Sequence, residues 1–387
     1  MTLSILILNR SYFAESLRRL GHRVVTAAPQ TERFEGFAED TGAREPVFDF
    51  FFPLGATLPE ILARCPKGFA PDRLVYHDDS NPIPYLLGLD QSPIPTLFYS
   101  VDCHLHFAVH PQISGLFDQV LCAQADYVPR YARYCQRAAW FPLWARYIEP
   151  LDSTKTIDAC FRGNLDPAMH PQRATFFAEL QRFVPINVEV GPYRKTYASA
   201  KIVVNHAVRE DLNFRVFEIL GCGALAITPN IGNGMGELFT DGQDIVTYRD
   251  GDAADAAAKI QYYLQHEDER ARIAAAGYNR CVLLHSEDIR ARQLEEHLLR
   301  LQVSRRPRAQ FGAAYARFGM ARLCRNRFAA RALEEFRAAG EHLVASFERG
   351  EIRDDEVSTI VHLCERDLAA YGEQEIRHKL RTCYGLS

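Results

Sequence analysis

Short apolar runs alternate with amphipathic stretches over the first 300 residues. The apolar runs predict buried strands, while stretches such as 13–20 carry apolar residues at helical spacing. The predicted strands are Ser4–Leu8, Arg23–Ala27, Val47–Phe52, Arg73–Tyr76, Thr96–Ser100, Gln119–Cys122, Ala139–Phe141, Ile157–Phe161, Asn187–Val190, Ile202–Asn205, Leu225–Thr228 and Ile245–Tyr248. Strands that alternate with helices predict α/β architecture, with mostly parallel sheets covered on both faces.

Two breaks divide this pattern. The stretch 144–155 has no clear periodicity and follows Pro142, so we interpret it as a crossover between two Rossmann-like domains, residues 1–145 and 146–303. The basic stretch 304–308 is interpreted as a solvated linker. The pattern is helical from there to residue 387, and 313–339 is similar to one tetratricopeptide unit. We therefore expect a helical extension over residues 304–387 that caps the two domains.

The charge, the apolar stretches and the cysteines of the chain exclude several classes of protein. The chain has 387 residues and a formal net charge of −4, which does not favour binding to nucleic acid. No apolar stretch is long enough for a transmembrane segment, and the first residues predict a strand rather than a signal peptide. The ten cysteines form no C-x-x-C pair, so we expect reduced thiols and no zinc site. These features predict a cytoplasmic location.

The stretch 201–228 carries the most informative chemistry. It is typical of a strand, a polar loop, a helix, a glycine turn and another strand. Ligands of open parallel sheets bind beyond the carboxyl ends of strands, so the loop and the helix start face the ligand crevice. Glu210 and Glu218 stand there with seven residues between them, and carboxylates suit sugar hydroxyls. Arg215 offers a guanidinium fork for phosphate oxygens.

A family resemblance centres on this stretch. The motif at 213–224, Asn-Phe-Arg-Val-Phe-Glu-Ile-Leu-Gly-Cys-Gly-Ala, resembles the glycosyltransferase module of the CgeB-like spore-maturation proteins, a branch of the GT-B enzymes near glycosyltransferase family 4. The likeness extends over roughly residues 70–300. It implies a GT-B fold, in which two Rossmann-like domains face each other across a cleft. It also implies transfer of a sugar from a nucleotide-diphosphate sugar to an acceptor hydroxyl.

The resemblance assigns roles in the second domain. Glu218 matches the glutamate that binds the ribose hydroxyls in this family, and Glu210 falls at the position that contacts the donor sugar. The loop around Arg162, Arg215 and the glycine turn at 221–223 would lie near the pyrophosphate. Glu237 would reach the ligand or cap the following helix. The full set of predicted donor-binding residues is Glu218, Arg215, Asn213, Arg162, Gly163, Tyr193, Gly223 and Glu237.

The first domain is expected to bind the acceptor, which is a glycan, a protein or a cell-surface polymer. Asp102, His104 and His106 directly follow a predicted strand. With Glu210 they are the candidate catalytic residues, because a histidine oriented by a carboxylate accepts a proton from a hydroxyl. If the reaction retains the anomeric configuration, as the Glu-x7-Glu likeness indicates, no base is needed, and the histidines would position phosphate or acceptor instead.

No cofactor beyond the donor is expected. The pair at 78–79 could suggest a metal site, but enzymes of this fold generally work without metal, so metal is disfavoured. The stretch 9–11 lacks the glycines that dinucleotide binding requires in the first domain. Two alternatives remain: a sugar-nucleotide epimerase or hydrolase on the same fold, and a catalytically silent nucleotide-sugar-binding scaffold whose helical extension recruits a protein partner.

Overall fold

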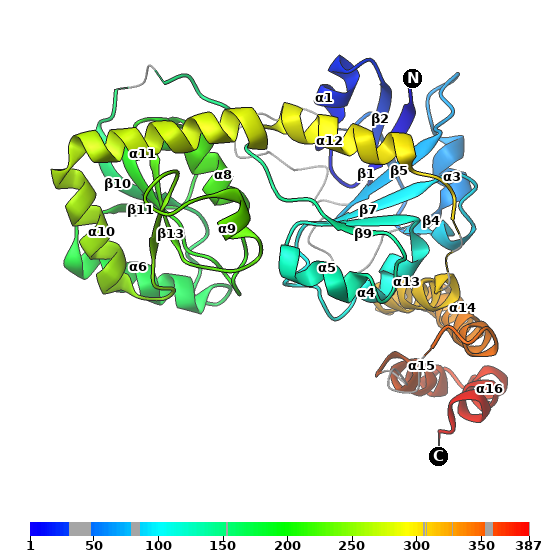
Figure 1. Ribbon diagram of the computed structural model, residues 1–387. Helices are drawn as coiled ribbons and strands as arrows, with labels where there is room; N and C mark the ends of the chain where they lie inside the picture. Colours follow the sequence, from blue (N-terminus) through cyan, green and yellow to red (C-terminus); the bar gives the residue numbers. More distant parts are fainter. Residues whose placement is uncertain are drawn as a thin grey trace.

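The computed structural model describes residues 1–30, 48–78, 86–151, 154–304, 306, 308–326, 328–352 and 359–386. Two α/β domains lie side by side, and further helices follow below the first of them (Figure 1). The first domain has a seven-stranded sheet and the second a five-stranded one, and every strand pair in both is parallel. The predicted α/β class is confirmed.

The first sheet has the strand order β3-β2-β1-β5-β7-β8-β9. Its strands are β1 (Ser4–Leu8), β2 (Arg23–Pro29), β3 (Phe50–Phe52), β5 (Arg73–His77), β7 (Thr96–Ser100), β8 (Gln119–Cys122) and β9 (Ala138–Trp140). All five residues of β7 are buried, as expected for an inner strand of a parallel sheet that is covered on both faces. A separate short pair, β4 (Ala56–Thr57) and β6 (Leu86–Leu87), was not predicted.

The second sheet has the order β11-β10-β12-β13-β14. Its strands are β10 (Ile157–Arg162), β11 (Asn187–Glu189), β12 (Ala200–Val204), β13 (Leu225–Pro229) and β14 (Val246–Tyr248). The chain moves from β10 to one side and then returns to the other side at β12. Such a reversal opens a crevice at the carboxyl ends of the two strands. The first sheet has the same reversal between β1 and β5.

Helices cover the sheets of both domains. In the first domain they are α1 (Ala14–Arg19), α3 (Leu58–Ala63), α4 (His110–Ile113) and α5 (Val128–Tyr131), with 3-10 turns at Leu89–Gln91, Ser114–Leu116 and Ala125–Tyr127. In the second they are α6 (Pro171–Phe183), α7 (Arg194–Ala198), α8 (Phe214–Gly221), α9 (Met235–Leu238), α10 (Ala253–Gln265) and α11 (Glu267–Arg280). None of the described helices has the length and apolar character of a membrane span.

The chain crosses between the domains twice. The first crossing is the irregular segment around residues 141–151, and the second runs from α11 through a π-turn, Cys281–His285, into α12 (Glu287–Arg300). Helices α11 and α12 extend over both domains along the top of Figure 1. Helix α12 packs on α1, where Ser16 Oγ donates to Asp288 Oδ1 at 2.7 Å. Helix α12 therefore lies against the first domain, although it follows the second domain in the sequence.

The extension contains four helices in the described residues. They are α13 (Ala309–Cys324), α14 (Ala329–Glu348), α15 (Thr359–Ala370) and α16 (Gln374–Tyr384). Helix α13 packs on α4 of the first domain, and α14 contacts α13, α15 and α16. A core that includes Phe336, Leu343 and Leu368 joins the four helices. The helical extension therefore docks on one domain and is not spread over both.

The basic stretch at 304–308 is not a solvated linker where the structure describes it. The Arg306 side chain is buried, and its guanidinium donates to both carboxylate oxygens of Asp118, at 3.0 and 2.7 Å. Arg308 is also buried and lies over the rings of Tyr134 and Phe311. The prediction was wrong because a run of basic residues gives no sign of a buried partner that lies far away in the sequence.

We predict that Arg306→Ala destabilises the protein by about 3–5 kcal/mol, because it leaves the Asp118 carboxylate buried without its counter-charge. Unfolding in urea, followed by circular dichroism, measures this change. Arg292→Ala is the matched control, because Arg292 is exposed on α12, and it should change stability by less than about 0.5 kcal/mol.

The same pair predicts a pH dependence. Burial opposes ionisation of Asp118, but hydrogen bonds from Arg306, Ser304 and Thr96 outweigh it and lower the pKa of this carboxyl. A lowered folded-state pKa stabilises the protein above the unfolded value of about 4, and this contribution is lost as the pH falls further. The stability gap between the wild type and Asp118→Asn should therefore narrow below pH 4. A gap that widens there would contradict the assignment.

Candidate functional site between the two domains

The candidate site lies where the strand ends of the two sheets meet. From the first domain it receives the segment after β7, with Asp102 and His104, and the segment after β8, with Gln124. From the second domain it receives the loop after β12 and the start of α8. Direct contacts join the two sides. Gln124 accepts a hydrogen bond from Leu212 N at 3.0 Å, and Asp126 Oδ2 accepts one from Asn233 N at 3.0 Å.

Helix α8 begins at a capped N-terminus. Asn213 is the N-cap residue, and its Oδ1 accepts a hydrogen bond from Arg215 N at 3.1 Å. Asparagine is among the best N-cap residues because its side chain replaces a missing backbone acceptor in the first turn. This cap fixes the helix start at the reversal point of the sheet.

The Arg215 guanidinium is fixed at the same point. Its Nε donates to the carbonyl of Arg162 at 3.2 Å and its Nη1 to Asn205 Oδ1 at 3.1 Å, and the group lies 4.6 Å from the centre of the Phe161 ring. Gly163 lies directly beside it. A Cβ atom at Gly163 would come within 2.7 Å of Arg215 Nη2, so the glycine makes this close approach possible. The structure thus brings Arg215 and Gly163 together.

A second arginine also lies near the Phe161 ring. Arg173 on α6 is 8% exposed, donates to the carbonyl of Asn164 at 3.2 Å, and faces the Phe161 ring from 5.9 Å. Burial and the nearby Arg215 charge lower the pKa of Arg173 to about 10. Neither arginine forms a salt bridge with a carboxylate among the described residues. The sequence analysis missed Arg173, although its place in the first turn of the helix after β10 is a signal that it points back to the strand end.

Asp211, in the loop before α8, contributes a carboxylate to the site. The Asp211 carboxylate accepts a hydrogen bond from Gln124 Nε2 at 2.6 Å and lies 3.6 Å from His104 Nδ1. Burial raises the pKa of Asp211 well above its usual value, and the charge of Asp102 adds to this effect. Burial also lowers the pKa of His104 to about 4. Burial therefore disfavours the charged form of both groups.

The structure separates Glu210 from this group. Arg209 and Glu210 have positive φ angles of 52° and 58°, which turn the chain sharply before Asp211. Glu210 is exposed and lines a cavity of about 590 Å³ together with His206 and the start of α6. The carboxylate that contacts the first domain is therefore that of Asp211, while the predicted role of Glu210 at the donor sugar stays a prediction. His106 also turns away, since its ring lies 5.0 Å from that of His110, which is buried in the first domain.

Glu218 lies one turn into α8 and is half-buried. Its charge reaches Tyr193, where burial first and Glu218 second raise the pKa of the phenol. The ring of Tyr193 is 5% exposed and packs 5.3 Å from that of Tyr197. The family resemblance places the segment that contains Tyr193 near the nucleotide base, and this role stays a prediction for a ring that packs in the core.

Among the remaining predicted donor residues, Arg162 contacts Arg215 through its backbone carbonyl and not through its side chain. Gly223 follows the end of α8 and packs against Leu151 of the first crossing, so this turn has a packing role. Eight helical residues, about 12 Å, separate it from the helix start. The Arg162 guanidinium is directed to the neighbouring strand, where it pairs with Glu189 at 3.0 Å. Glu237 is exposed on the short helix α9.

Comparisons with known proteins agree with this architecture. The fold is that of the GT-B glycosyltransferases. A glycosyltransferase from Rickettsia africae matches with a TM-score of 0.53 and 11% identity, over 77% of this chain and 99% of that chain. Anabaena Alr3699/HepE, solved with UDP and glucose, matches with a TM-score of 0.56 and 10% identity, over 77% and 100%. The predicted GT-B fold is confirmed.

The sequence comparison identifies the second domain. Residues 151–296 match the family model described as "Glycosyl transferase-like". This part of the chain is therefore a glycosyltransferase-like domain, and it contains α8 with Asn213, Arg215 and Glu218. No curated protein matches the sequence.

We predict that His104 titrates with a midpoint near 4, because burial disfavours the imidazolium. The ordinary value is about 6.5, so the unfolded chain takes up this proton first, and His104 lowers the stability of the fold as the pH falls from 6.5 towards 4. A ¹H–¹³C NMR titration measures the midpoint, with the resonance assigned by its loss in His104→Gln. A midpoint close to that of N-acetylhistidine amide in the same buffer would contradict the burial argument.

Proposed function

We propose that the protein is a glycosyltransferase that moves a sugar from a nucleotide-diphosphate sugar to an acceptor hydroxyl. The observation that carries the proposal is the pair of guanidinium groups at Arg173 and Arg215. Both lie over Phe161 at the reversal point of the second sheet. Two adjacent cations without a salt-bridge partner repel each other and are stabilised by a shared anion. The diphosphate of a nucleotide sugar is an anion of this kind, and it is long enough to contact both guanidinium groups.

Other groups complete the proposed donor site. The first turn of α8 offers backbone N–H groups and the positive end of the helix dipole to the diphosphate. Glu218 lies one turn further along the same helix, where its carboxylate would accept hydrogen bonds from the ribose hydroxyls. As the donor bond breaks, negative charge grows on the departing diphosphate. Arg173 and Arg215 would stabilise that charge, which is a form of electrostatic catalysis by groups already in place.

The proposal includes retention of the anomeric configuration and catalysis without metal. The low pKa of His104 supports retention, since an imidazole of that basicity is a weak base for an acceptor hydroxyl at neutral pH. Among the described residues no group of three or more His, Cys, Asp or Glu side chains is placed to hold a metal ion. The CgeB-like motif at 213–224 supports an enzyme of that subtype that acts inside the cell.

We predict that Arg173→Gln and Arg215→Gln each weaken donor binding by about 1.5–3 kcal/mol, or roughly tenfold to a hundredfold, through the lost charged hydrogen bonds. A thermal-shift screen of UDP-, GDP-, ADP- and dTDP-sugars first selects the donor. Isothermal titration calorimetry then measures its affinity. Arg182→Gln, on the exposed end of the same helix as Arg173, is the control and should bind normally. Unchanged affinity in a folded Arg173 or Arg215 variant would overturn the proposed diphosphate site.

We predict that Glu218→Ala weakens binding of the ribonucleoside diphosphate by about 1–3 kcal/mol. The same variant should bind the 2′,3′-dideoxy analogue as well as the wild type does, because that analogue lacks the two hydroxyls. Asp268→Ala, at an exposed position of helix α11, is the matched control. An equal loss for both nucleotides would show that Glu218 acts on the fold and not on the ribose.

Analysis of the reaction products distinguishes the proposed sugar transfer from hydrolysis and from epimerisation of the nucleotide sugar. ¹H NMR of the reaction with donor and acceptor should show a new glycosidic anomeric signal with the configuration of the donor. Free sugar formed at the same rate without acceptor would indicate a hydrolase, and a changed sugar still attached to the nucleotide would indicate an epimerase.

A further inference from the structure

Two buried thiols lie in contact beside the interdomain site. Cys122 is the last residue of β8, and Cys103 lies three residues beyond the end of the neighbouring parallel strand β7. Their Sγ atoms are 3.6 Å apart, and the thiol of Cys122 donates to that of Cys103. Among the described residues no other two cysteines are hydrogen-bonded to each other. The thiols of Cys135 and Cys281, for example, donate to backbone carbonyls instead.

The position of the two thiols allows a disulfide. Sulfur atoms in a disulfide are about 2 Å apart, so these two would have to approach each other by roughly 1.6 Å. Cys103 belongs to a turn and not to the sheet. It can therefore move without breaking the hydrogen bonds that pair β7 with β8.

The second domain lies against these thiols. Both cysteines are fully buried, and burial raises the pKa of Cys103 well above its usual value. Asp211 of the second domain lies close enough to Cys103 to add to this shift. A buried, protonated thiol reacts slowly with oxidants, because the thiolate is the reactive form. The pair is therefore protected while the domains are in contact.

Polar contacts hold the second domain at this end of the first sheet. Gln124 accepts a hydrogen bond from Leu212 N, and Asp126 accepts one from Asn233 N, each at 3.0 Å. Water can replace contacts of this kind, so domains joined by them are expected to move relative to each other. Separation of the domains here would expose Cys103 to solvent.

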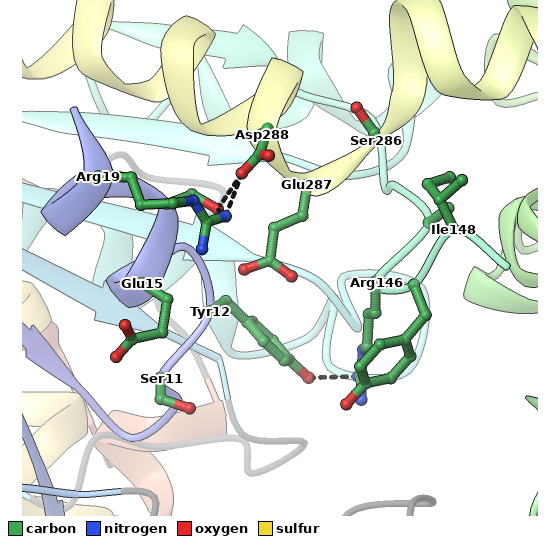
Figure 2. A pocket seen from close by; sticks show the side chains of 12 residues that line it. Ser11, Tyr12, Glu15, Arg19, Arg146, Ile148, Ser286, Glu287 and Asp288 are labelled. Atoms are coloured by element: carbon green, nitrogen blue, oxygen red, sulfur yellow. Dashed lines mark hydrogen bonds and ion pairs between the residues drawn. The ribbon is translucent and has the colours of Figure 1, made fainter. Parts of the chain in front are cut away.

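The hinge is held by other side chains. Figure 2 shows Arg146 of the first crossing directed to the Tyr12 hydroxyl, at 2.8 Å. It also shows Arg19 of α1 directed to Asp288 of α12. None of these four residues takes part in the polar contacts beside the thiols. The domains can therefore separate at the thiols while both chain crossings stay attached to the first domain.

We infer that Cys103 and Cys122 are a modification site at which a peroxide forms a disulfide when the two domains separate. The Cys103 thiolate attacks one oxygen of hydrogen peroxide, the O–O bond breaks, and a sulfenic acid and hydroxide form. The Cys122 sulfur then attacks the Cys103 sulfur, the S–S bond forms, and the sulfenic hydroxyl leaves as water. The two thiols together lose two electrons and two protons, and the peroxide is reduced to two molecules of water. This oxidation does not require the proposed sugar transfer.

The disulfide would alter the contact between the domains. His104 directly follows Cys103 and lies 3.6 Å from Asp211 of the second domain. The Cys122 thiol contacts the carbonyl of Gln124 at 3.2 Å. Movement of the two sulfur atoms towards each other therefore displaces groups of the first domain that contact the second. We expect weaker contact between the domains in the oxidised protein.

Mass spectrometry of the full chain tests the pair. The protein is treated with millimolar hydrogen peroxide, and the protease Asp-N then cleaves before Asp118, between the two cysteines. Without reductant, the peptide with Cys103 should be linked to the peptide with Cys122, and dithiothreitol should separate them. Cys103→Ala should lose the link, and Cys135→Ala is the matched control that keeps it. Absence of the link in folded wild-type protein would overturn the inference, whether or not the variants fold.

A second variant tests the control by domain separation. Asp126→Ala removes the acceptor of Asn233 N, and it should fold because Asp126 is exposed. The disulfide should form about tenfold faster, since a lost charged hydrogen bond shifts the opening equilibrium by about that factor. Asp268→Ala, exposed on α11, should react at the wild-type rate. An unchanged rate in Asp126→Ala would overturn the role of domain separation.

Hydrogen exchange compares the reduced and oxidised proteins. Backbone amides at residues 209–213 should exchange faster after oxidation, because the loop loses contacts with the first domain. Exchange at residues 253–265 on α10, away from the contact, serves as the internal control and should stay the same. Equal exchange at 209–213 in both forms would overturn the proposed effect on the domain contact.

Discussion

Two guanidinium groups, those of Arg173 and Arg215, share the face of one aromatic ring at the point where the second sheet reverses direction. Burying like charges together is costly, because each is desolvated and each repels the other. The lowered pKa of Arg173 is one measure of that cost. The fold retains the arrangement by fixing both groups with backbone carbonyls and by placing Gly163 where any side chain would collide. The arrangement is explained if a bound anion offsets the repulsion and the desolvation of the two guanidinium groups.

The strands and the capped helix were predictable because their causes are local. The buried strand Ser4–Leu8 is apolar at four of its five positions, and the helix that begins at Phe214 follows a polar loop. The direction of side chains was less predictable. The positive φ angles at Arg209 and Glu210 decide which carboxylate enters the interdomain site, and a sequence pattern gives no sign of them.

Partners that lie far apart in the sequence account for the other differences. Arg306 belongs to a charge run, and only the folded chain shows that it meets Asp118 inside the protein. Tyr193 occupies a loop that was expected to face a base, yet packing against Tyr197 buries its ring. In both cases burial depends on how distant elements dock. Patterns of a few residues predict local helices and strands well. They do not predict which distant parts of the chain pack on a helix or strand and bury it.

The two domains meet through polar contacts and one aromatic cluster, and this distribution matters for how the protein works. Gln124 holds the loop at 211–212 with hydrogen bonds, while Tyr12, Trp144 and Phe214 pack edge to face beside the first crossing. Polar contacts between domains are easily exchanged for water, so they allow opening, whereas rings at the hinge keep their contact during a small rotation.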